Sequence, residues 1–298
     1  MSYFTPLTDR DIPSLSAFFG QNPHRFCDFT AYNTWIWGKY LHAALATFHG
    51  ITILRRNMMD ERTCLYPLGV SLSKEGVLSC LLEVAKKEGI SPTLFPLTRE
   101  EKDYILTLYP QSQAETQEGW WDYLYLRDDL ANLSGKKYHG QRNFLRRFRT
   151  LYPPGKCVPL DEVKKDDVAH FLAQFYQNPP ASGTAVEAEM VSLLSLLSSP
   201  LPQGMSGMAL TTGEDIVALA LGEVVGDTLY IHIEKARRTC PGAYQAIVHG
   251  FASAHEGVLY INREEDDGNE GLRTSKLSYH PKERLQKWAV TISAPPCI

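Results

Sequence analysis

The sequence has 298 residues, enough for one large domain or two of ordinary size, and its apolar content of 44% can supply a substantial core. The formal net charge of −4 excludes a globally basic protein that coats nucleic acid, but not a local basic patch. Six scattered cysteines without CxxC spacing disfavour a zinc site and suit free thiols, so we expect a cytoplasmic protein. No apolar stretch reaches the ~18–20 residues of a membrane span, so any action on lipids is expected from the membrane surface.

The first half predicts helices over residues 10–48, strands at 49–56 and 62–70, and an amphipathic helix at 74–89. Val77, Leu81 and Val84 form the apolar stripe of that helix, and Gly89 ends it. A short strand at 92–97 and a helix at 99–110 follow. The polar stretch QSQAETQEG then predicts a boundary between an N-terminal domain, 1–119, and a C-terminal domain, 120–298.

The second half opens with a predicted strand at 120–130 and a helix within 134–155, whose apolar stripe is Phe144, Leu145, Phe148 and Leu151. The elements expected after it are a strand at 156–161, helices at 163–178 and 184–199, three strands within 207–236, a helix at 241–257, a strand at 258–261, a helix over 270–278 and a last strand at 284–292. This order predicts a mixed α/β (α+β) fold. The first half repeats it in shorter form, which predicts a duplicated unit.

Four stretches together resemble a known bacterial family: CDFTAYNTWIW, YLRDDLANLSGKKYHGQRNFLRRF, GAYQAIVHGFA and YINREEDDGNEGLRTSKLSYHP. The family is that of the C-terminal domain of phosphatidylglycerol lysyltransferases. The resemblance implies a tandem duplication of acyl-CoA N-acyltransferase (GNAT)-like units, each a mixed, mostly antiparallel sheet flanked by helices. It also implies aminoacyl transfer from aminoacyl-tRNA to a lipid headgroup. The chain departs from the membrane-bound members in lacking their transmembrane portion, so acyl transfer is better supported than a lipid acceptor.

A basic helix is the first candidate site. No acidic residue lies between Asp129 and Asp161, while seven lysines and arginines do. The helix face with Arg142 and Arg146 is expected to hold phosphates of tRNA, of a lipid headgroup or of a cofactor. The family resemblance adds Lys137, His139 and Asn143 to this phosphate-binding set. The alternative is a solvated helix that faces nearby acids.

The segment RRTCPGAYQA stands where acetyltransferases carry a glycine-rich turn for the pyrophosphate of coenzyme A. Arg238 and Gly242 fit that turn, but Cys240 or Pro241 replaces its middle glycine. The pattern therefore disfavours tight binding of coenzyme A and agrees with an aminoacyl-tRNA donor. A helix that simply begins at a proline is the structural alternative.

The strand LYIHIEKA carries two candidate catalytic residues. Strict alternation predicts that His232 and Glu234 face one way with Tyr230, while Ile231 and Ile233 face the other way. In the acetyltransferase-like fold this strand borders the acyl cleft, so His232 or Glu234 is a candidate general base. The alternative is a histidine whose hydrogen bonds are satisfied at the sheet edge.

The acid run Glu264 to Asp267 follows the last buried strand and resembles a metal loop. The calcium-loop spacing fails because an arginine would occupy the first ligand position, so we predict no metal site, with a looser Mg²⁺ site as the alternative. We expect Asp267 or Asn269 to cap the following helix instead. Side chains near this strand end are expected to line the cleft, namely Asn262, Asp266, Arg273, Lys276 and Tyr279. Salt bridges within a structural loop are the alternative.

These observations predict an acyltransferase that moves an aminoacyl group from aminoacyl-tRNA to an amine or hydroxyl, with His232, Glu234 and Asn262 as its catalytic residues. A coenzyme A thioester is the alternative donor, and a non-catalytic module that binds anions or RNA is the alternative class. No other cofactor is implied. Expected partners are tRNA and a small-molecule or lipid-headgroup acceptor, with peripheral membrane contact left open. The sequence leaves the oligomeric state undetermined.

Overall fold

The computed structural model describes residues 2–22, 24–58, 60–153, 155–176 and 183–293. The last two residues of the helix expected at 163–178, together with Pro154 and Cys297, lie outside this description. The chain forms two compact units, unit 1 from Met1–Trp121 with Leu285–Ile298 and unit 2 from Asp122–Arg284. The expected boundary at 119/120 is close to Trp121, where the chain first passes from unit 1 to unit 2. The C-terminal segment, however, belongs to unit 1 and not to the expected C-terminal domain.

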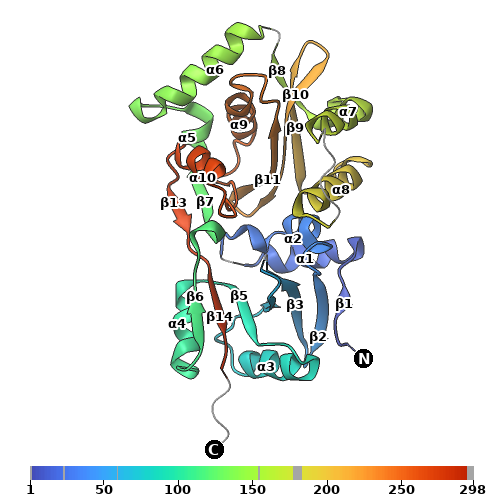
Figure 1. Ribbon diagram of the computed structural model, residues 1–298, viewed down its shortest axis with the longest axis vertical. Coiled ribbons are helices and arrows are strands. Elements are labelled where there is room, and N and C mark those ends of the chain that lie inside the picture. Colours follow the sequence, from blue (N-terminus) through green and yellow to red (C-terminus); the bar gives the residue numbers. More distant parts are fainter. Residues whose placement is uncertain (1, 23, 59, 154, 177–182, 294–298) are drawn as a thin grey trace, which may run out of the picture. The chain divides into compact units, whose positions relative to one another are not determined.

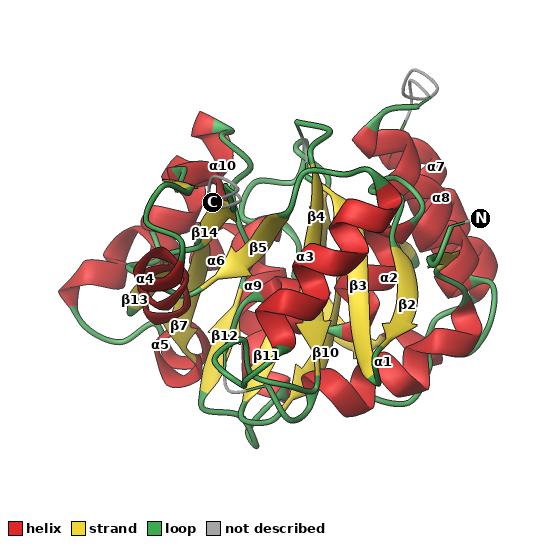
Figure 2. Ribbon diagram, turned by 90° about the horizontal axis from the view of Figure 1, so that it is seen from below, coloured by secondary structure: helices red, strands yellow, loops and turns green. Residues whose placement is uncertain are grey.

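Unit 1 is built on a seven-stranded mixed sheet and its flanking helices. Its strands are β1 (Thr5–Pro6), β2 (Ala44–Phe48), β3 (Ile51–Asn57), β4 (Thr63–Leu68), β5 (Thr93–Leu97), β6 (Gln113–Glu115) and β14 (Trp288–Thr291). Its α-helices are α1 (Ile12–Phe19), α2 (Ala31–Gly38), α3 (Val77–Glu88) and α4 (Arg99–Leu108), and its 3-10 helices are η1 (Asp9–Asp11), η2 (Cys27–Phe29) and η3 (Glu118–Trp120). The sheet order is β1-β2-β3-β4-β5-β14-β6. Figure 2 shows α3 lying across β3 and β4.

Unit 2 has a second seven-stranded mixed sheet, in the order β13-β7-β12-β11-β10-β9-β8. Its strands are β7 (Asp122–Leu126), β8 (Lys156–Pro159), β9 (Met205–Thr212), β10 (Asp215–Val225), β11 (Thr228–Ala236), β12 (Tyr260–Asn262) and β13 (Glu283–Leu285). Its α-helices are α5 (Arg127–Asn132), α6 (His139–Leu151), α7 (Lys165–Phe175), α8 (Ala185–Leu197), α9 (Ala243–Ala254) and α10 (Glu270–Leu277), with 3-10 helices η4 (Lys136–Tyr138) and η5 (Leu160–Glu162). The predicted fold class, two tandem mixed sheets flanked by helices, is confirmed.

The two units share one strand order. In each, an antiparallel meander (β2–β3–β4 or β9–β10–β11) leads into a crossover helix, α3 or α9. The next strand, β5 or β12, then pairs parallel to the last strand of the meander. A second helix and a short edge strand follow, α4 with β6 or α10 with β13. This repeated order is the internal duplication that the sequence predicts.

The strand beside each parallel pair comes from a distant part of the chain. In unit 2, β7 pairs antiparallel with β12, although β7 directly follows the edge strand of unit 1. In unit 1, β14 pairs antiparallel with both β5 and β6, although β14 directly follows the edge strand of unit 2. Figure 1 shows β14, in red, beside β5 and β6. Each unit therefore receives one internal strand from the chain segment that leaves the other unit.

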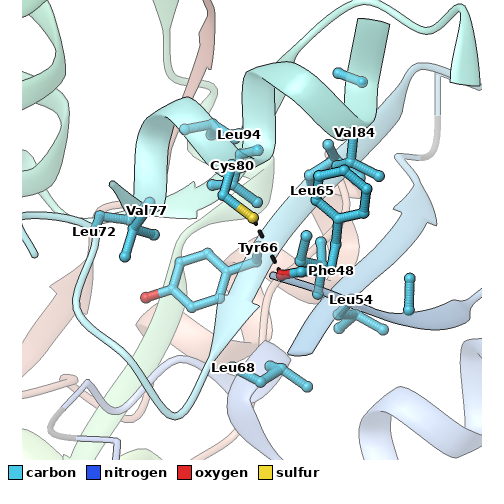
Figure 3. Packing of buried hydrophobic residues seen from close by; sticks show 14 of the residues in the cluster. Phe48, Leu54, Leu65, Tyr66, Leu68, Leu72, Val77, Cys80, Val84 and Leu94 are labelled. Atoms are coloured by element: carbon cyan, nitrogen blue, oxygen red, sulfur yellow. Dashed lines mark hydrogen bonds between the residues drawn. The ribbon is translucent and has the colours of Figure 1, made fainter. Parts of the chain in front are cut away.

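The core of unit 1 packs α3 against its sheet. Val77, Leu81 and Val84, the predicted stripe of α3, are each at most 1% exposed. Figure 3 shows Val77 and Val84 among the strand side chains of this core, and the thiol of Cys80 donates a hydrogen bond to the carbonyl of Phe48. A left-handed Gly89 ends the helix, as predicted.

Three predicted elements differ from the structure. The strand expected at 120–130 ends at Leu126, and helix α5 (Arg127–Asn132) follows it. Residues 10–48 are not helical throughout, because Ala44–Phe48 forms strand β2 and pairs with β3 across a turn at His49 and Gly50. The single strand expected at 284–292 is two strands in different sheets, β13 and β14. The errors at 10–48 and 284–292 concern apolar runs whose strand partners are set by tertiary packing, which local periodicity does not report.

A buried ion cluster accompanies β14 in unit 1. The ammonium of Lys287, 1% exposed, lies 2.6 Å from a carboxylate oxygen of Asp28, and Arg56 also binds that carboxylate. Burial favours the neutral acid, but the two cations outweigh it and hold the pKa of Asp28 well below its usual range. Asp28 therefore stays ionised in the core and depends on the C-terminal segment for one of its partners.

Candidate functional site

The parallel pairing of β11 and β12 ends early, and this positions the candidate site. The pairing covers three residues of each strand and stops at Asn262. β11 continues to Ala236 with β10 as its partner on the other side. Beyond Asn262, the side chains of Arg263 and Glu264 contact this extended part of β11. Carboxyl ends of parallel strands are where α/β sheets place their ligands.

A β-bulge decides which way the polar side chains of β11 face. Ile233 lies opposite Leu221 of β10. The preceding pair in the ladder joins Ile231 to Gly222, so His232 has no residue opposite it. Bulges of this kind concentrate beside active sites, where they redirect a side chain.

The bulge overturns the predicted alternation along β11. Glu234 lies opposite Ala220, a member of the core cluster that packs against α9. His232 reaches Glu223, which is three residues from Ala220 on β10 and so faces the other side of the sheet. The prediction that His232 and Glu234 share one face is therefore wrong, because the bulged residue shifts the period by one.

His232 is held between two carboxylates. Its Nδ1 lies 2.7 Å from Glu264 and its Nε2 lies 3.1 Å from Glu223, and its side chain is 1% exposed. Burial disfavours the charged ring, but the hydrogen bonds and charges of both glutamates outweigh burial and raise the pKa of His232 to about 9. At neutral pH the imidazolium keeps both protons engaged. This geometry contradicts the predicted general-base role, because a base must be free to accept a proton.

Glu234 forms the second ion pair at the strand end. Its Oε2 accepts hydrogen bonds from Nε and Nη2 of Arg263 at 3.1 and 2.7 Å. The guanidinium lies over the ring of Tyr279, with 4.8 Å between the guanidinium carbon and the ring centroid. The side chain of Glu234 is 14% exposed and that of Arg263 is 5% exposed. Arg263 has a central place that the sequence analysis missed, although it directly follows the predicted Asn262.

Three buried polar atoms in this cluster have no hydrogen-bond partner among the described residues: Oε1 of Glu234, Nη1 of Arg263 and the hydroxyl of Tyr279. Burial raises the pKa of Tyr279 above its ordinary value, so the hydroxyl remains a donor. Unsatisfied buried polar groups are rare and costly, and they often mark a functional site. One acceptor and two donors of this buried cluster therefore have no hydrogen-bond partner among the described residues.

Asn262 and Lys276 have structural partners, contrary to their predicted roles. The amide of Asn262 donates to Asp122 at 2.8 Å and accepts from the backbone N–H of Glu264 at 2.7 Å. The ammonium of Lys276 donates to three successive backbone carbonyls, those of residues 263, 264 and 265. Both side chains are buried and hold the loop that carries Arg263 and Glu264. They position the site and do not line it.

The acid run, Glu264 to Asp267, belongs to this loop and helps to hold it in place through Asp266. Asp266 accepts two hydrogen bonds from Arg273, at 2.9 and 3.0 Å, and one from the hydroxyl of Tyr123 at 2.6 Å. Asn269 caps α10 by accepting from the N–H of Leu272, as predicted. Asp266 and Arg273 therefore fit the alternative of a salt bridge within a structural loop better than they fit substrate binding.

The N-terminus of α9 is covered by α6. A Cβ at Gly242 would lie 2.3 Å from the carbonyl oxygen of Phe144 and 2.9 Å from Cβ of Phe148. Gly76 caps α3 with a similar φ, 80° against 89°, yet nothing lies within 4 Å of its Cβ position. Gly242 thus allows the close packing of α9 against α6. Arg238, at the same turn, is exposed.

We expect Gly242→Ala to destabilise unit 2, because the new Cβ meets the backbone of α6. The loss should exceed that of Gly226→Ala, in the same unit, by about 1–3 kcal/mol. Gly226 also has a positive φ, 60°, but its Cβ position is open, so this control isolates the cost of backbone conformation. Urea unfolding followed by far-ultraviolet circular dichroism measures both, and equal losses would contradict the packing explanation.

The five predicted phosphate-binding residues in and near α6 make three kinds of contact. Arg142 points inward and donates to the carbonyls of Leu133 and Gly135, so it closes the preceding loop. His139 and Asn143 bond each other at 3.0 Å. The other two predicted residues are exposed, with Lys137 3.2 Å from Asp129 and Arg146 3.4 Å from the side chain of Asn143.

Two tandem units of one strand order, each with a single parallel pair after an antiparallel meander, define an acetyltransferase-like fold. The sequence model of the family described as phosphatidylglycerol lysyltransferase, C-terminal, matches residues 24–291. The chain belongs to this family, which confirms the resemblance seen in the sequence. Lysyl transfer is an acyl transfer, so the family relates the chain to acyltransferases.

Solved structures and one curated protein are similar to the chain. A conserved protein of unknown function from Bacteroides thetaiotaomicron is 28% identical with a TM-score of 0.85, covering 98% of this chain and 100% of that one. A C-terminal domain attributed to a lysylphosphatidylglycerol synthetase of Agrobacterium fabrum has a TM-score of 0.64 at 12% identity, covering 95% and 92%. An uncharacterized protein of Mycoplasmoides gallisepticum is 23% identical over 175 residues, which span 57% of this chain and only 56% of that protein. Among the described residues, no helix is long and apolar enough to cross a bilayer.

Proposed function

We propose that the chain transfers an aminoacyl group from aminoacyl-tRNA to an amine or hydroxyl acceptor, at the end of β11. The observation that carries this proposal is the set of three unsatisfied atoms on Glu234, Arg263 and Tyr279. Acyl transfer requires one acceptor for the proton of the nucleophile and donors for the oxyanion. The set provides both kinds of group, and family membership supports the reaction class.

In the proposed mechanism, Oε1 of Glu234 accepts the proton of the attacking amine or hydroxyl. The nucleophile forms a bond to the acyl carbon, and the ester carbonyl becomes an oxyanion. Nη1 of Arg263 and the hydroxyl of Tyr279 donate hydrogen bonds to that oxyanion. The ester bond to the ribose then breaks, and the ribose oxygen leaves with the proton held by Glu234. His232 does not take part as a base in this scheme.

The aminoacyl-tRNA donor is preferred to coenzyme A because of the α9 N-terminus. A pyrophosphate at such a helix end needs open backbone N–H groups. Here the carbonyl of Phe144 and the side chain of Phe148 pack against the cap residue Gly242, and Pro241, just before it, has no N–H to offer. Both features disfavour a coenzyme A thioester at this position.

We expect Glu234→Gln and Tyr279→Phe each to lower the transfer rate about a hundredfold. The assay follows the loss of label from radiolabelled aminoacyl-tRNA with ethanolamine or with phosphatidylglycerol vesicles as acceptor. Tyr279→Phe should leave the melting temperature unchanged, because its hydroxyl has no partner among the described residues. Tyr125→Phe is the matched control: it loses a 2.8 Å hydrogen bond to the carbonyl of Lys276, about 1 kcal/mol of stability, and keeps its rate.

Three outcomes would oppose the proposal. Full activity of Tyr279→Phe and Glu234→Gln would remove these side chains from the mechanism. Transfer from acetyl-coenzyme A, with micromolar binding of coenzyme A, would overturn the choice of donor. Absence of transfer from both donors would favour a binding module that retains the fold.

A further inference from the structure

The C-terminal end of helix α9 carries a serine–histidine pair that the proposed mechanism does not use. Nε2 of His255 lies 2.7 Å from Oγ of Ser206, the second residue of β9. Nδ1 of the same ring lies 2.7 Å from the carbonyl oxygen of Phe251, one turn earlier on α9. The two rings also meet edge to face, with 4.6 Å between their centroids. These contacts fix both the position and the orientation of the imidazole.

The same contacts decide which nitrogen of His255 carries the proton. A carbonyl oxygen can only accept a hydrogen bond, so Nδ1 donates to Phe251. In the neutral imidazole, Nε2 then has a free lone pair and accepts the hydroxyl proton of Ser206. Nucleophile, base and orienting group stand in this relation in serine-dependent acyl transfer, here with a backbone carbonyl in place of the usual carboxylate.

The pair is partly open to solvent. Ser206 and His255 are half-buried, while Gly204 and Glu256 beside them are exposed. β8 pairs with β9 from Met208 to Thr211, so Ser206 lies beyond the end of that neighbouring strand. A small molecule in solution can therefore approach Oγ of Ser206, whereas a bulky one meets the surrounding chain.

We propose that Ser206 and His255 form a second reactive site, which takes small, unhindered carboxylic esters. Nε2 of His255 accepts the hydroxyl proton as Oγ of Ser206 forms a bond to the acyl carbon. The ester bond then breaks, and the leaving alcohol takes the proton from Nε2. Water attacks the acyl-serine, releases the acid and returns a proton to Oγ. This reaction is separate from the proposed aminoacyl transfer and uses none of its three side chains.

A fluorophosphonate probe and p-nitrophenyl acetate test the site on the full-length protein. We expect a single phosphonyl adduct on the intact chain, mapped to Ser206 by peptide mass spectrometry. p-Nitrophenyl acetate should acetylate the same serine and release nitrophenol over repeated turnovers. Ser206→Ala should abolish both reactions. His255→Gln, which keeps a polar side chain beside Ser206, should slow labelling about a hundredfold because the base is lost.

Matched controls lie on the same helix. Ser253 is half-buried too, but its hydroxyl donates to the carbonyl of His249 at 2.7 Å and not to an imidazole. Ser253→Ala and His249→Gln should therefore leave the labelling rate unchanged. An adduct on another residue, equal labelling of His255→Gln, or no adduct on the unaltered protein overturns the proposal. The adduct on the unaltered protein is mapped without any variant, so the proposal stays testable if a substitution prevents folding, which circular dichroism would reveal.

Discussion

A chain that ends at Gln286 should lose the folded structure of unit 1, because it lacks β14. Val290 and Ile292 are 0% and 3% exposed, and their removal forfeits about 1.5–3 kcal/mol each. Loss of Lys287 also leaves the buried Asp28 without one of its two cations, which costs about 3–5 kcal/mol. The sum is comparable to the whole stability of an ordinary domain, about 5–15 kcal/mol.

Tryptophan fluorescence measures this loss selectively. All five tryptophans, at positions 35, 37, 120, 121 and 288, belong to unit 1. The truncated chain should show the emission of solvent-exposed tryptophan, while circular dichroism retains the contribution of unit 2. A chain that ends at Ser293 keeps β14 and is the control. Adding a peptide of residues 285–293 should restore the spectrum, and a folded spectrum without that peptide would refute the role of β14.

The stability of unit 2 should fall as the pH rises from about 6.5 to about 9. The pKa of His232 is about 9 in the folded chain, against 6.5 for an ordinary histidine. Because the folded pKa is the higher one, the stabilisation is fully present below pH 6.5 and is lost as the pH rises through 9. The shift corresponds to about 3 kcal/mol. Hydrogen exchange of the β11 amides, measured across this range, reports the free energy of opening.

Two comparisons test the origin of this pH dependence. The imidazole signal in nuclear magnetic resonance should titrate near pH 9. Glu264→Gln should move that titration toward the ordinary value, because one of the two carboxylates is removed. The pH dependence of opening should shrink with it. A titration of His232 near pH 6.5 in the unaltered chain would show that the carboxylates do not hold the proton.

Local signals predicted many of the elements correctly. The stripe on α3, its terminal Gly89 and the Asn269 cap of α10 depend on residues within a few positions of one another, which sequence spacing reports directly. Strand β2 was missed because its residues carry no strand signal strong enough to outweigh a helical neighbourhood. Its identity depends on pairing with β3.

The site was predicted only as a region. The strand end at Asn262 and the residues Glu234 and Tyr279 lie together in the structure, whereas Arg142 and Gly242 serve packing. The bulge at His232 makes the side chains of His232 and Glu234 face opposite sides of the sheet. No residue of β11 signals this bulge in the sequence. Partners such as Arg263 became visible only when β11 and the loop after β12 were brought together.

The sequence by itself determined the order of elements, the duplicated α/β plan and the family, because these depend on spacing and on motifs within continuous segments. Only the tertiary structure decided that β14 lies between β5 and β6, that His232 and Glu234 face opposite sides, and that Phe144 and Leu151 remain exposed. The physical reason is shared by all three. Strand partners, ladder register and the burial of a helix face are set by contacts between segments that are distant in the chain.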